Sequence, residues 1–432
     1  MFRSSVGGRD AARRVYRHAL VGLIIPLIAP LAAGPGWSAL SLALASVLMS
    51  WDPAPTLAQR FESALATLDQ ALPRRRRTGR TYQGFVKALT ARGGAVLGAL
   101  VTHLRTLTQQ AAGKCWRVGG ERGFVPIGAD GSKFDAPRTV GNGALGFTGK
   151  DKCAPQMITL LLVHLGSMLP WAWKTAGART SERTLLREML GLLPERTLLV
   201  ADAGFTGFDL LSGLRARGHS FLIRVGRGTR LLTGLGYARR EGQSTVYLWP
   251  ETGRGRPPLV LRLIRVGRAH LLTDVRDPRR LSKRLAGELY RRRWGLEVAF
   301  RSLKQTLERR AVRSGTADHA RAELDWAVLG MWVLALLGAG AIAAAGHGAR
   351  RLSLAGALAA VRAARHRAIS TRTLRGRLRR AVLDTYKRNG SRRSYRWPRQ
   401  KPPPVIRPPR LTAATPAQVA QAARLRSRRD AA

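Results

Sequence analysis

The stretch from Leu281 to Leu307 constrains the fold of this chain more than any other. It contains no proline, and its apolar residues recur at spacings of three, four and seven, which predicts one long helix with a buried stripe, made imperfect by Gly287 and Gly295. The stripe consists of Leu285, Leu289, Leu296, Phe300, Leu303 and Leu307. A helix of this kind must pack one face against another layer of the protein.

A second stripe on the same predicted helix carries polar groups, namely Tyr290, Arg293, Glu297, Arg301 and Lys304. At roughly 100° per residue, the fourteen positions from first to last drift only about 40° around the axis, so these side chains project together. A single acid among several cations beside a buried seam is not the pattern of a solvated face. The stripe therefore predicts a functional site.

The charge of the chain indicates a polyanionic partner. Its 432 residues include 75 Lys and Arg but only 25 Asp and Glu, a formal net charge of +50. Genomic base composition can explain the excess of Arg over Lys, but not the scarcity of acids, so nucleic acid is the expected partner. The only cysteines, Cys115 and Cys153, form no CxxC motif and favour neither a zinc site nor a secreted disulfide fold. A cytoplasmic protein associated with nucleic acid is expected.

Two apolar runs of the sequence approach the length of a membrane span. Residues 19–51 are interrupted by Pro26, Pro30 and Pro35, which favours two short buried helices. Residues 328–345 reach a marginal spanning length, yet they continue a stretch that carries Glu323 and Asp325. A buried core helix is the preferred interpretation, and no membrane partner is expected.

The first 115 residues have helical periodicity throughout, with Thr56 as a helix cap. The run of four arginines at residues 74–77 predicts that this is a DNA-binding domain, because a compact helical unit with an Arg cluster suits duplex DNA. A solvated basic loop explains the arginines equally well.

Residues 116–226 change to strand periodicity and predict the first part of an α/β core. Three strands, a helix, a strand, a helix and a further strand follow in order, which indicates a mixed sheet flanked by helices. Asp130 and Asp202 are predicted at the ends of the first and fourth strands, at the sheet edge where sites form. Residues 227–275 predict a β-rich insertion, and residues 276–346 the second part of the core. Residues 347–432 predict a basic tail, helical at first and then Pro- and Arg-rich and extended or disordered.

Three carboxylates define the expected chemistry. Asp130, Asp202 and Glu297 would repel one another at a single point unless hard cations bound them, and oxygen ligands favour Mg²⁺ or Mn²⁺. Two such ions can promote an in-line phosphoryl transfer. A single Asp at a strand end is more often a turn or cap, so the combination with the helical stripe carries the prediction. Asp135 has the wrong parity to face the same site as Asp130.

The cations of the stripe are expected to bind DNA. Arg293, Arg301 and Lys304 would hold phosphates, and Tyr290 can hydrogen-bond one. Trp294 offers a face on which an unstacked base can lie.

The segment YRRRWGLEVAFRSLK matches the Tyr-x₂-Arg-x₃-Glu-x₆-Lys signature at every spacing, through Tyr290, Arg293, Glu297 and Lys304. It resembles the DDE transposases of the fourth bacterial insertion-sequence family. Asp130-Gly131-Ser132 and Asp202-Ala203-Gly204-Phe205 resemble the two Asp motifs of that family, and Arg313-Ser314 a pair that follows its helix. The resemblance covers roughly residues 120–345.

The resemblance implies an RNase H-like fold in which Asp130, Asp202 and Glu297 bind the catalytic metal. It implies strand cleavage at insertion-sequence ends and strand transfer into target DNA, by a protein that acts as a homodimer. Tyr290, Arg293 and Lys304 would contact phosphates of the element's end.

Four other interpretations stay open. One is a domesticated or inactive transposase-derived nuclease, and another is a non-catalytic DNA-binding protein of the same origin. A membrane protein and a basic RNA-associated protein fit parts of the composition but not the three carboxylates.

Overall fold

The computed structural model of the chain describes residues 18–34, 36–72, 79–120, 123–148, 154–366, 369–383 and 407–431. The chain forms two compact units. The first consists of Met1–Trp116, Asp130–Ser181 and Gly295–Leu383, and the second of Arg117–Ala129, Glu182–Trp294 and Asp384–Ala432. The predicted basic run at residues 74–77, and most of the Pro- and Arg-rich part of the tail, lie outside the described residues.

Helices dominate the first unit. They are α2 (Ala19–Ile24), α3 (Ala39–Trp51), α4 (Leu57–Ala71), α5 (Tyr82–Ala112), α9 (Trp294–Arg301), α10 (Ala317–Ala343), α11 (Leu354–His366) and α12 (Thr371–Arg379). Trp294, the first residue of α9, belongs to the second unit. The two short helices expected in residues 19–51 are confirmed as α2 and α3. The Thr56 side chain accepts from the backbone N–H of Gln59 and completes a capping box, so the predicted cap of α4 is confirmed too.

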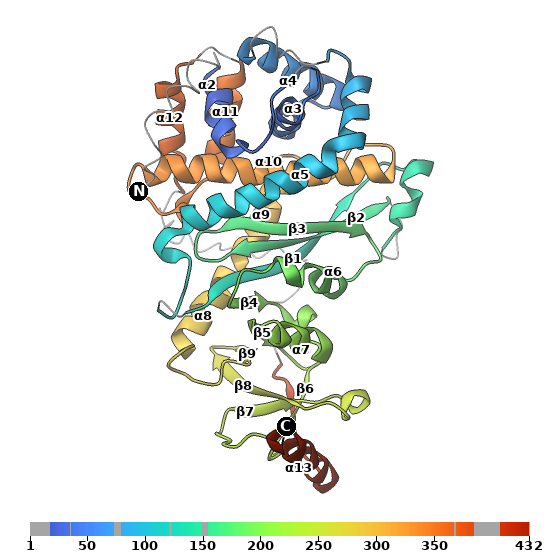
Figure 1. Ribbon diagram of the computed structural model, residues 1–432, viewed down its shortest axis with the longest axis vertical. Helices are drawn as coiled ribbons and strands as arrows, with labels where there is room; N and C mark the ends of the chain where they lie inside the picture. The colour runs from blue at the N-terminus through green and yellow to red at the C-terminus, as the bar shows by residue number, and fades with distance from the viewer. Residues whose placement is uncertain are drawn as a thin grey trace, which may run out of the picture. The chain divides into compact units, whose positions relative to one another are not determined.

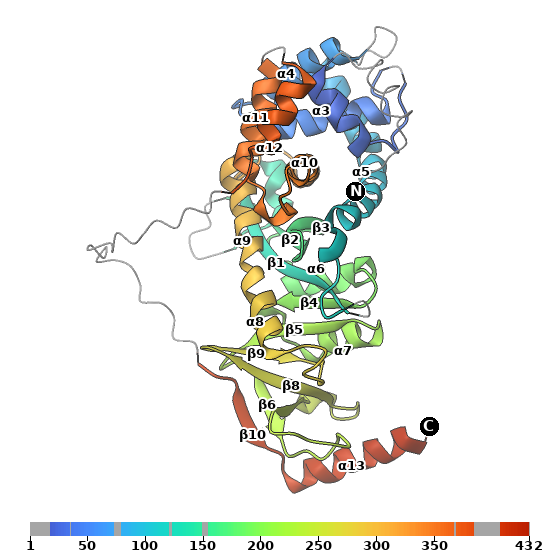
Figure 2. The same ribbon diagram turned by 90° about the vertical axis from the view of Figure 1, so that its left-hand side faces the viewer.

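Helix α10 is the central element of the first unit. It runs between the strands β2 and β3 on one side and the helices α3, α11 and α12 on the other (Figures 1 and 2). Its carbonyl at Gly330 accepts a 2.9 Å hydrogen bond from Trp51 Nε1, and its Trp332 Nε1 donates to Thr108 Oγ1 at 2.8 Å. Length and composition would let Tyr82–Cys115 and Ala317–Ala343 cross a membrane, but 83% of the most apolar window of α10 is buried inside the protein. That burial supports the interpretation of α10 as a core helix.

The sheet has ten strands in the order β10-β6-β7-β8-β9-β5-β4-β1-β2-β3. Strand β1 (Val125–Asp135) has residues in both units, while β2 (Gln156–His164) and β3 (Leu169–Gly177) form an antiparallel pair in the first. In the second unit, β4 (Thr197–Ala201) pairs in parallel with β1 and with β5 (Ser220–Val225). Helix α6 (Glu182–Met189) precedes β4 in the chain, and helix α7 (Phe208–Ala216) connects β4 to β5. The predicted mixed sheet flanked by helices is therefore confirmed, with the β3-β2-β1-β4-β5 order of an RNase H-like fold.

The β-rich insertion before the signature helix is confirmed as well. It consists of the antiparallel strands β6 (Arg230–Thr233), β7 (Thr245–Leu248), β8 (Leu259–Val266) and β9 (Ala269–Thr273). The end of the chain adds to it, because β10 (Arg410–Ala413) pairs in parallel with β6. Helix α13 (Pro416–Ala431) follows, and its Gln421 and Arg426 donate to backbone carbonyls of the insertion at 2.9 and 2.8 Å. The sequence did not predict this strand and helix.

Two local predictions were wrong. The stretch 281–307 is not one helix but α8 (Lys283–Arg292), α9 (Trp294–Arg301) and a π-helical end (Ser302–Thr306), with a turn at Arg293. The Arg293 N–H keeps its helical bond to the Leu289 carbonyl and shares it with the Tyr290 carbonyl, both at 3.2 Å, as in a tightened helix end. Since π turns hold more residues than α turns, the uniform 100° step does not extend to Lys304.

The second correction concerns Asp130, which lies within β1 rather than at its end. The Asp130-Gly131 pair suggested a turn, but Gly131 does not have a positive φ and the strand continues to Asp135. Asp130 and Asp135 then point to opposite faces, as the parity argument predicted.

Candidate active site

Asp202 is the best-defined predicted site residue of the second unit. It directly follows β4, as predicted, and caps the short 3-10 helix Ala203–Phe205 by accepting from the Ala203 N–H at 2.7 Å. Its side chain is 32% exposed, so the carboxylate is reachable from solvent. The apolar run before it forms a fully buried strand, which places the carboxylate at the point where the strand leaves the sheet.

Two guanidinium groups surround the Asp202 carboxylate. Arg224 Nε lies 2.7 Å from Asp202 Oδ1, and Arg224 Nη2 donates to Oδ2 at 3.3 Å. Arg293 Nη2 lies 3.9 Å from Oδ2. Arg224 reaches this position because β5 pairs with β4 in a register that sets Ile223 beside Ala201. The geometry of the Arg224 contact is the two-pronged one that Arg forms with carboxylates.

The signature residues Tyr290 and Arg293 join Asp202 in the second unit. The Arg293 guanidinium carbon is 5.5 Å from the centre of the Tyr290 ring and 5.9 Å from that of Trp294. Burial and then the Asp202 charge raise the pKa of the Tyr290 hydroxyl, so it stays a hydrogen-bond donor at neutral pH. Arg293 is 4% exposed, whereas Trp294 is 58% exposed. An open aromatic face therefore adjoins a buried cation.

The first unit contains Asp130, Glu297, Arg301 and Lys304. Lys304 Nζ donates to Ser132 Oγ at 2.8 Å and lies 4.9 Å from the centre of the Phe134 ring, so the Lys304 side chain runs to the face of β1 that carries Asp130. Desolvation by burial lowers the pKa of the Lys304 amine, although the charge of Asp135 opposes the shift. Asp130 and Glu297 are half-buried, and Arg301 is exposed.

Across the described residues, no three or more His, Cys, Asp or Glu side chains are grouped as a metal site would require. Asp202 belongs to one unit and Asp130 and Glu297 to the other, so the convergence of the three stays a prediction. Their donor chemistry nevertheless fits a hard divalent cation, because all three supply carboxylate oxygens, and the one-third-exposed Asp202 carboxylate is reachable beside Arg224 and Arg293.

Sequence reasoning missed three residues of this region. Arg224 carried a signal, since it is the one cation in an otherwise apolar strand next to the strand that leads into Asp202. Gly295 and Met168 carried none. A Cβ at Gly295 would lie 2.0 Å from Met168 Cε, so only glycine lets Met168 pack there, and Met168 itself has a φ of 61°.

Comparison with known proteins agrees with the signature. Residues 126–334 match the family model described as "Transposase DDE domain". Transposase InsG for insertion sequence element IS4, from Escherichia coli (strain K12), is 26% identical over 230 residues, which are 48% of this chain and 50% of that relative. The chain thus spans about half the length of this curated relative.

A solved structure, a piggyBac transposase synaptic complex with hairpin DNA, aligns with 89% of this chain and 78% of its own. Its TM-score is 0.33 and its sequence identity 12%, an overlap too loose to relate the two folds. The assignment of this region therefore rests on the family match and on the Tyr-Arg-Glu-Lys signature that lies within it. Residues 126–334 of this chain match the model of a transposase DDE domain, and part of the chain is similar to a transposase of the IS4 element.

Proposed function

We propose that the chain is a DNA transposase that cleaves strands at the ends of an insertion sequence and transfers them into target DNA. The proposal rests on the position of Asp202. Its side chain is one-third exposed just after the end of β4, and Arg293 of the Tyr-Arg-Glu-Lys signature lies beside it. An acid that can bind a cation, next to groups that can bind phosphate, is what metal-assisted phosphoryl transfer requires.

Asp130, Asp202 and Glu297 are the proposed catalytic residues. DDE transposases depend on divalent metal, and for this chain we propose Mg²⁺ or Mn²⁺, as two ions held by these three carboxylates. Such ions supply Lewis acidity to the reacting phosphate. The protein's own contribution is to hold the carboxylates. β1 holds Asp130, the turn after β4 holds Asp202, and the first turn of α9 holds Glu297.

Tyr290, Arg293, Trp294, Arg301 and Lys304 are the proposed DNA-binding residues. Arg293 and Lys304 are pre-positioned by Asp202 and Ser132, so little side-chain entropy is lost when a phosphate binds them. The exposed ring of Trp294 suits the stacking of an unpaired base.

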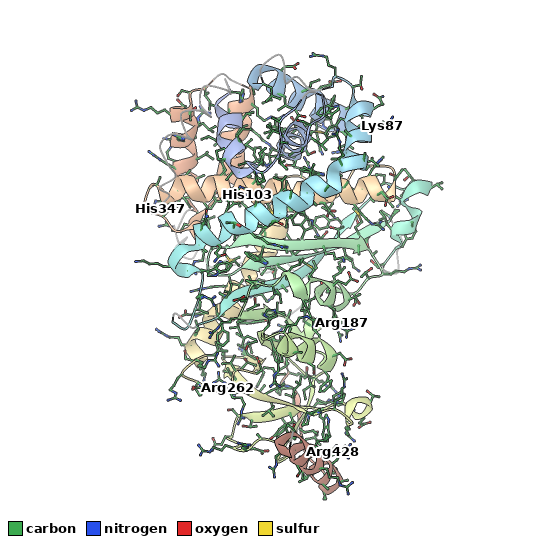
Figure 3. All side chains as sticks on the ribbon, in the orientation of Figure 1. Lys87, His103, Arg187, Arg262, His347 and Arg428 are labelled. Carbon is green, nitrogen blue, oxygen red and sulfur yellow. The ribbon has the colours of Figure 1, made fainter. Side chains whose placement is uncertain are left out.

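The DNA partner is supported by charge as well as by family. The net charge of +50 is spread over both units, with exposed cations such as Lys87 on α5, Arg187 on α6 and Arg428 on α13 (Figure 3). Binding that rests on many phosphate contacts is strongly salt-dependent and tolerates the loss of any one of them. We propose that two copies act together, each on one element end.

The test is cleavage of labelled DNA that carries the gene's own flanking sequences, in Mg²⁺, Mn²⁺ or EDTA. The wild type should nick at the element boundary only with metal, and Glu297→Ala should abolish nicking while DNA binding changes less than about twofold. Glu288→Ala is the matched control. It removes an acid on α8 that pairs with Arg292 at 3.8 Å and has no proposed catalytic role.

Nicking of the DNA by the Glu297→Ala variant would contradict the catalytic role proposed for Glu297. An equal loss of nicking in the Glu288→Ala control would contradict it too. Specific binding without metal-dependent cleavage by the wild type would favour the alternative, a domesticated or inactive transposase-derived protein.

A further inference from the structure

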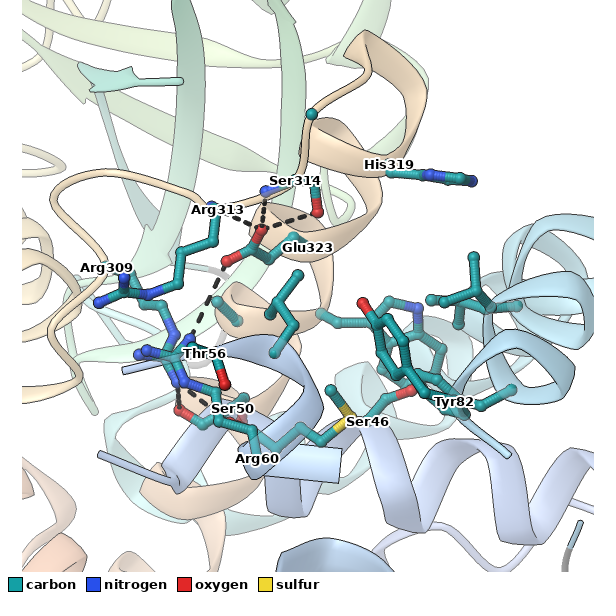
Figure 4. A pocket seen from close by; sticks show the side chains of 18 of the residues that line it. Ser46, Ser50, Thr56, Arg60, Tyr82, Arg309, Arg313, Ser314, His319 and Glu323 are labelled. Atoms are coloured by element: carbon teal, nitrogen blue, oxygen red, sulfur yellow. Dashed lines mark hydrogen bonds and ion pairs between the residues drawn. The ribbon is translucent and has the colours of Figure 1, made fainter. Parts of the chain in front are cut away.

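A cavity of about 530 Å³ lies within the first unit, in a region that contains none of the proposed catalytic residues (Figure 4). It is lined by residues of α3, α4, α5 and α10, and by the segment between the π turn and α10. Tyr82, Phe85, Leu89 and Trp326 give it an apolar and largely aromatic wall. Its volume is typical of pockets that hold a small organic molecule.

Two buried arginines form the opposite, cationic wall. Arg60 and Arg309 are each only 2% exposed, and both line the cavity. Arg60 donates from Nε to the Ala54 carbonyl at 2.7 Å, and its Nη2 has no hydrogen-bond partner among the described residues. Arg309 Nη2 donates to carbonyls at the end of α3, while Arg309 Nη1 likewise has no partner in the described part of the chain. Each guanidinium thus keeps a buried donor unused.

Glu323 is the acid nearest to these arginines, and it does not satisfy them. Its Oε2 is occupied by the N–H of Arg313 at 2.8 Å and by the N–H and Oγ of Ser314, both at 2.9 Å. Its Oε1 lies 4.0 Å from Arg60 Nη1, an ion pair beyond hydrogen-bonding distance (Figure 4). One carboxylate therefore faces two buried cations.

The other acids nearby are already paired. Asp52 Oδ2 lies 2.9 Å from Arg365, and Glu308 Oε1 lies 3.3 Å from Arg362. Burial, and after it the charge of Arg60, lower the pKa of the Arg309 guanidinium to about 9. A buried charge without a partner is costly, and an anion that accepts from both guanidinium groups would remove that cost.

We propose that this cavity binds a small organic monoanion, whose carboxylate or phosphate head pairs with Arg60 and Arg309 and whose apolar ring or acyl body packs against Tyr82, Phe85 and Trp326. The unused donors define the head, and the aromatic wall defines the body. No residue proposed to take part in catalysis or DNA binding lines the cavity.

The test is titration calorimetry of the full chain with biphenylcarboxylate, at about 0.5 M salt so that binding to exposed arginines is screened. The wild type should bind one equivalent. Biphenylmethanol, the neutral analogue, should bind at least about tenfold more weakly, and inorganic phosphate should compete only weakly because it lacks the apolar body.

Three variants make the test specific to the cavity. Arg60→Gln should weaken binding at least about tenfold. Leu89→Trp, which fills the cavity from a half-exposed position on α5 and leaves both arginines in place, should abolish binding. Arg105→Gln is the matched control, because Arg105 also donates from Nε to a carbonyl, at 3.0 Å to Trp171, but does not line the cavity. It should bind as the wild type does.

Absence of saturable binding to the wild type would overturn the proposal. So would unchanged binding by Leu89→Trp, or equal affinity for the acid and the neutral analogue.

Discussion

Arg224 holds the carboxylate of Asp202 with two contacts, Nε to Oδ1 at 2.7 Å and Nη2 to Oδ2 at 3.3 Å. Both side chains are about one-third exposed, at 34% and 32%. The pair fixes the orientation of the carboxylate at the end of β4 and places a positive charge where a metal ion would bind. Arg224 is therefore expected to control how readily Asp202 accepts a cation.

The first prediction follows from this competition. Arg224→Gln removes a charge that repels a divalent ion, so the apparent Kd of the protein for Mn²⁺ should fall by about three- to tenfold. Mn²⁺ binding is measured by titration calorimetry without DNA. Arg227→Gln, which removes an exposed arginine of the following turn, should leave the affinity unchanged. Weaker Mn²⁺ binding by Arg224→Gln would mean that the arginine positions Asp202 for the metal instead of competing with it.

The second prediction concerns Lys304, whose amine is held against Ser132 at 2.8 Å. Lys304→Ala should weaken binding of the element's end and cleavage together, by about three- to tenfold, because one positioned phosphate contact is lost. Gel shift and nicking are compared on the same DNA. Lys283→Ala, at the exposed start of α8, should change neither by more than about twofold. If Lys304→Ala lost cleavage but bound DNA as the wild type does, Lys304 would act in catalysis and not in phosphate binding.

The third prediction is a dependence of stability on pH through Asp325. This half-buried carboxylate of α10 accepts from Trp173 Nε1 and Thr175 Oγ1, both at 2.8 Å, and desolvation raises its pKa to about 6 from 3.8. A raised folded-state pKa means that the folded protein binds the proton more tightly. The protonated Asp325 therefore adds to the free energy of unfolding below about pH 4, and this contribution is lost as the pH rises through about 6.

Asp325→Asn keeps an oxygen that accepts both hydrogen bonds and removes the charge. The variant should be more stable than the wild type at pH 7, by about 1–3 kcal/mol, and should lack the slope between pH 4 and 6. Urea unfolding at several pH values measures this. Asp318→Asn, an exposed acid in the first turn of α10, is the control and should retain the wild-type slope. A destabilised Asp325→Asn at pH 7 would show that the buried charge itself is required.

The fourth prediction separates packing from helix propensity in α10. A Cβ at Gly330 would lie 1.9 Å from Ser50 Oγ and 2.8 Å from Ser50 Cβ, so Gly330→Ala should destabilise the protein by about 1–3 kcal/mol. Gly340, on the same helix, has open space around its Cβ position, and Gly340→Ala should stabilise by up to about 1 kcal/mol. Thermal unfolding of both variants compares the two effects. Equal shifts in the same direction would be inconsistent with the close approach of α3 to α10.

Local patterns were sufficient for most elements of the fold. Alternating and continuous apolar runs predicted the strands of the sheet and of its insertion except β10, and Thr56 predicted the start of α4. These succeed because periodicity and capping act over a few neighbouring residues. The same locality explains the two failures, since Asp130-Gly131 suggested a turn that strand pairing overrides, and the turn at Arg293 and the π end of the signature helix have no pattern of their own.

The sequence by itself determined that residues 126–334 match a transposase DDE domain and which acids are its catalytic candidates, because the signature's spacing is a property of the chain alone. Only the tertiary structure decided that Arg224 holds Asp202, that the end of the chain adds β10 to the insertion, and that Arg60 and Arg309 share one cavity. Each of these relationships joins residues far apart in the chain, and the nearest pair, Asp202 and Arg224, is 22 positions apart. Contacts at such separations depend on how elements pack, and no spacing in the sequence specifies that packing.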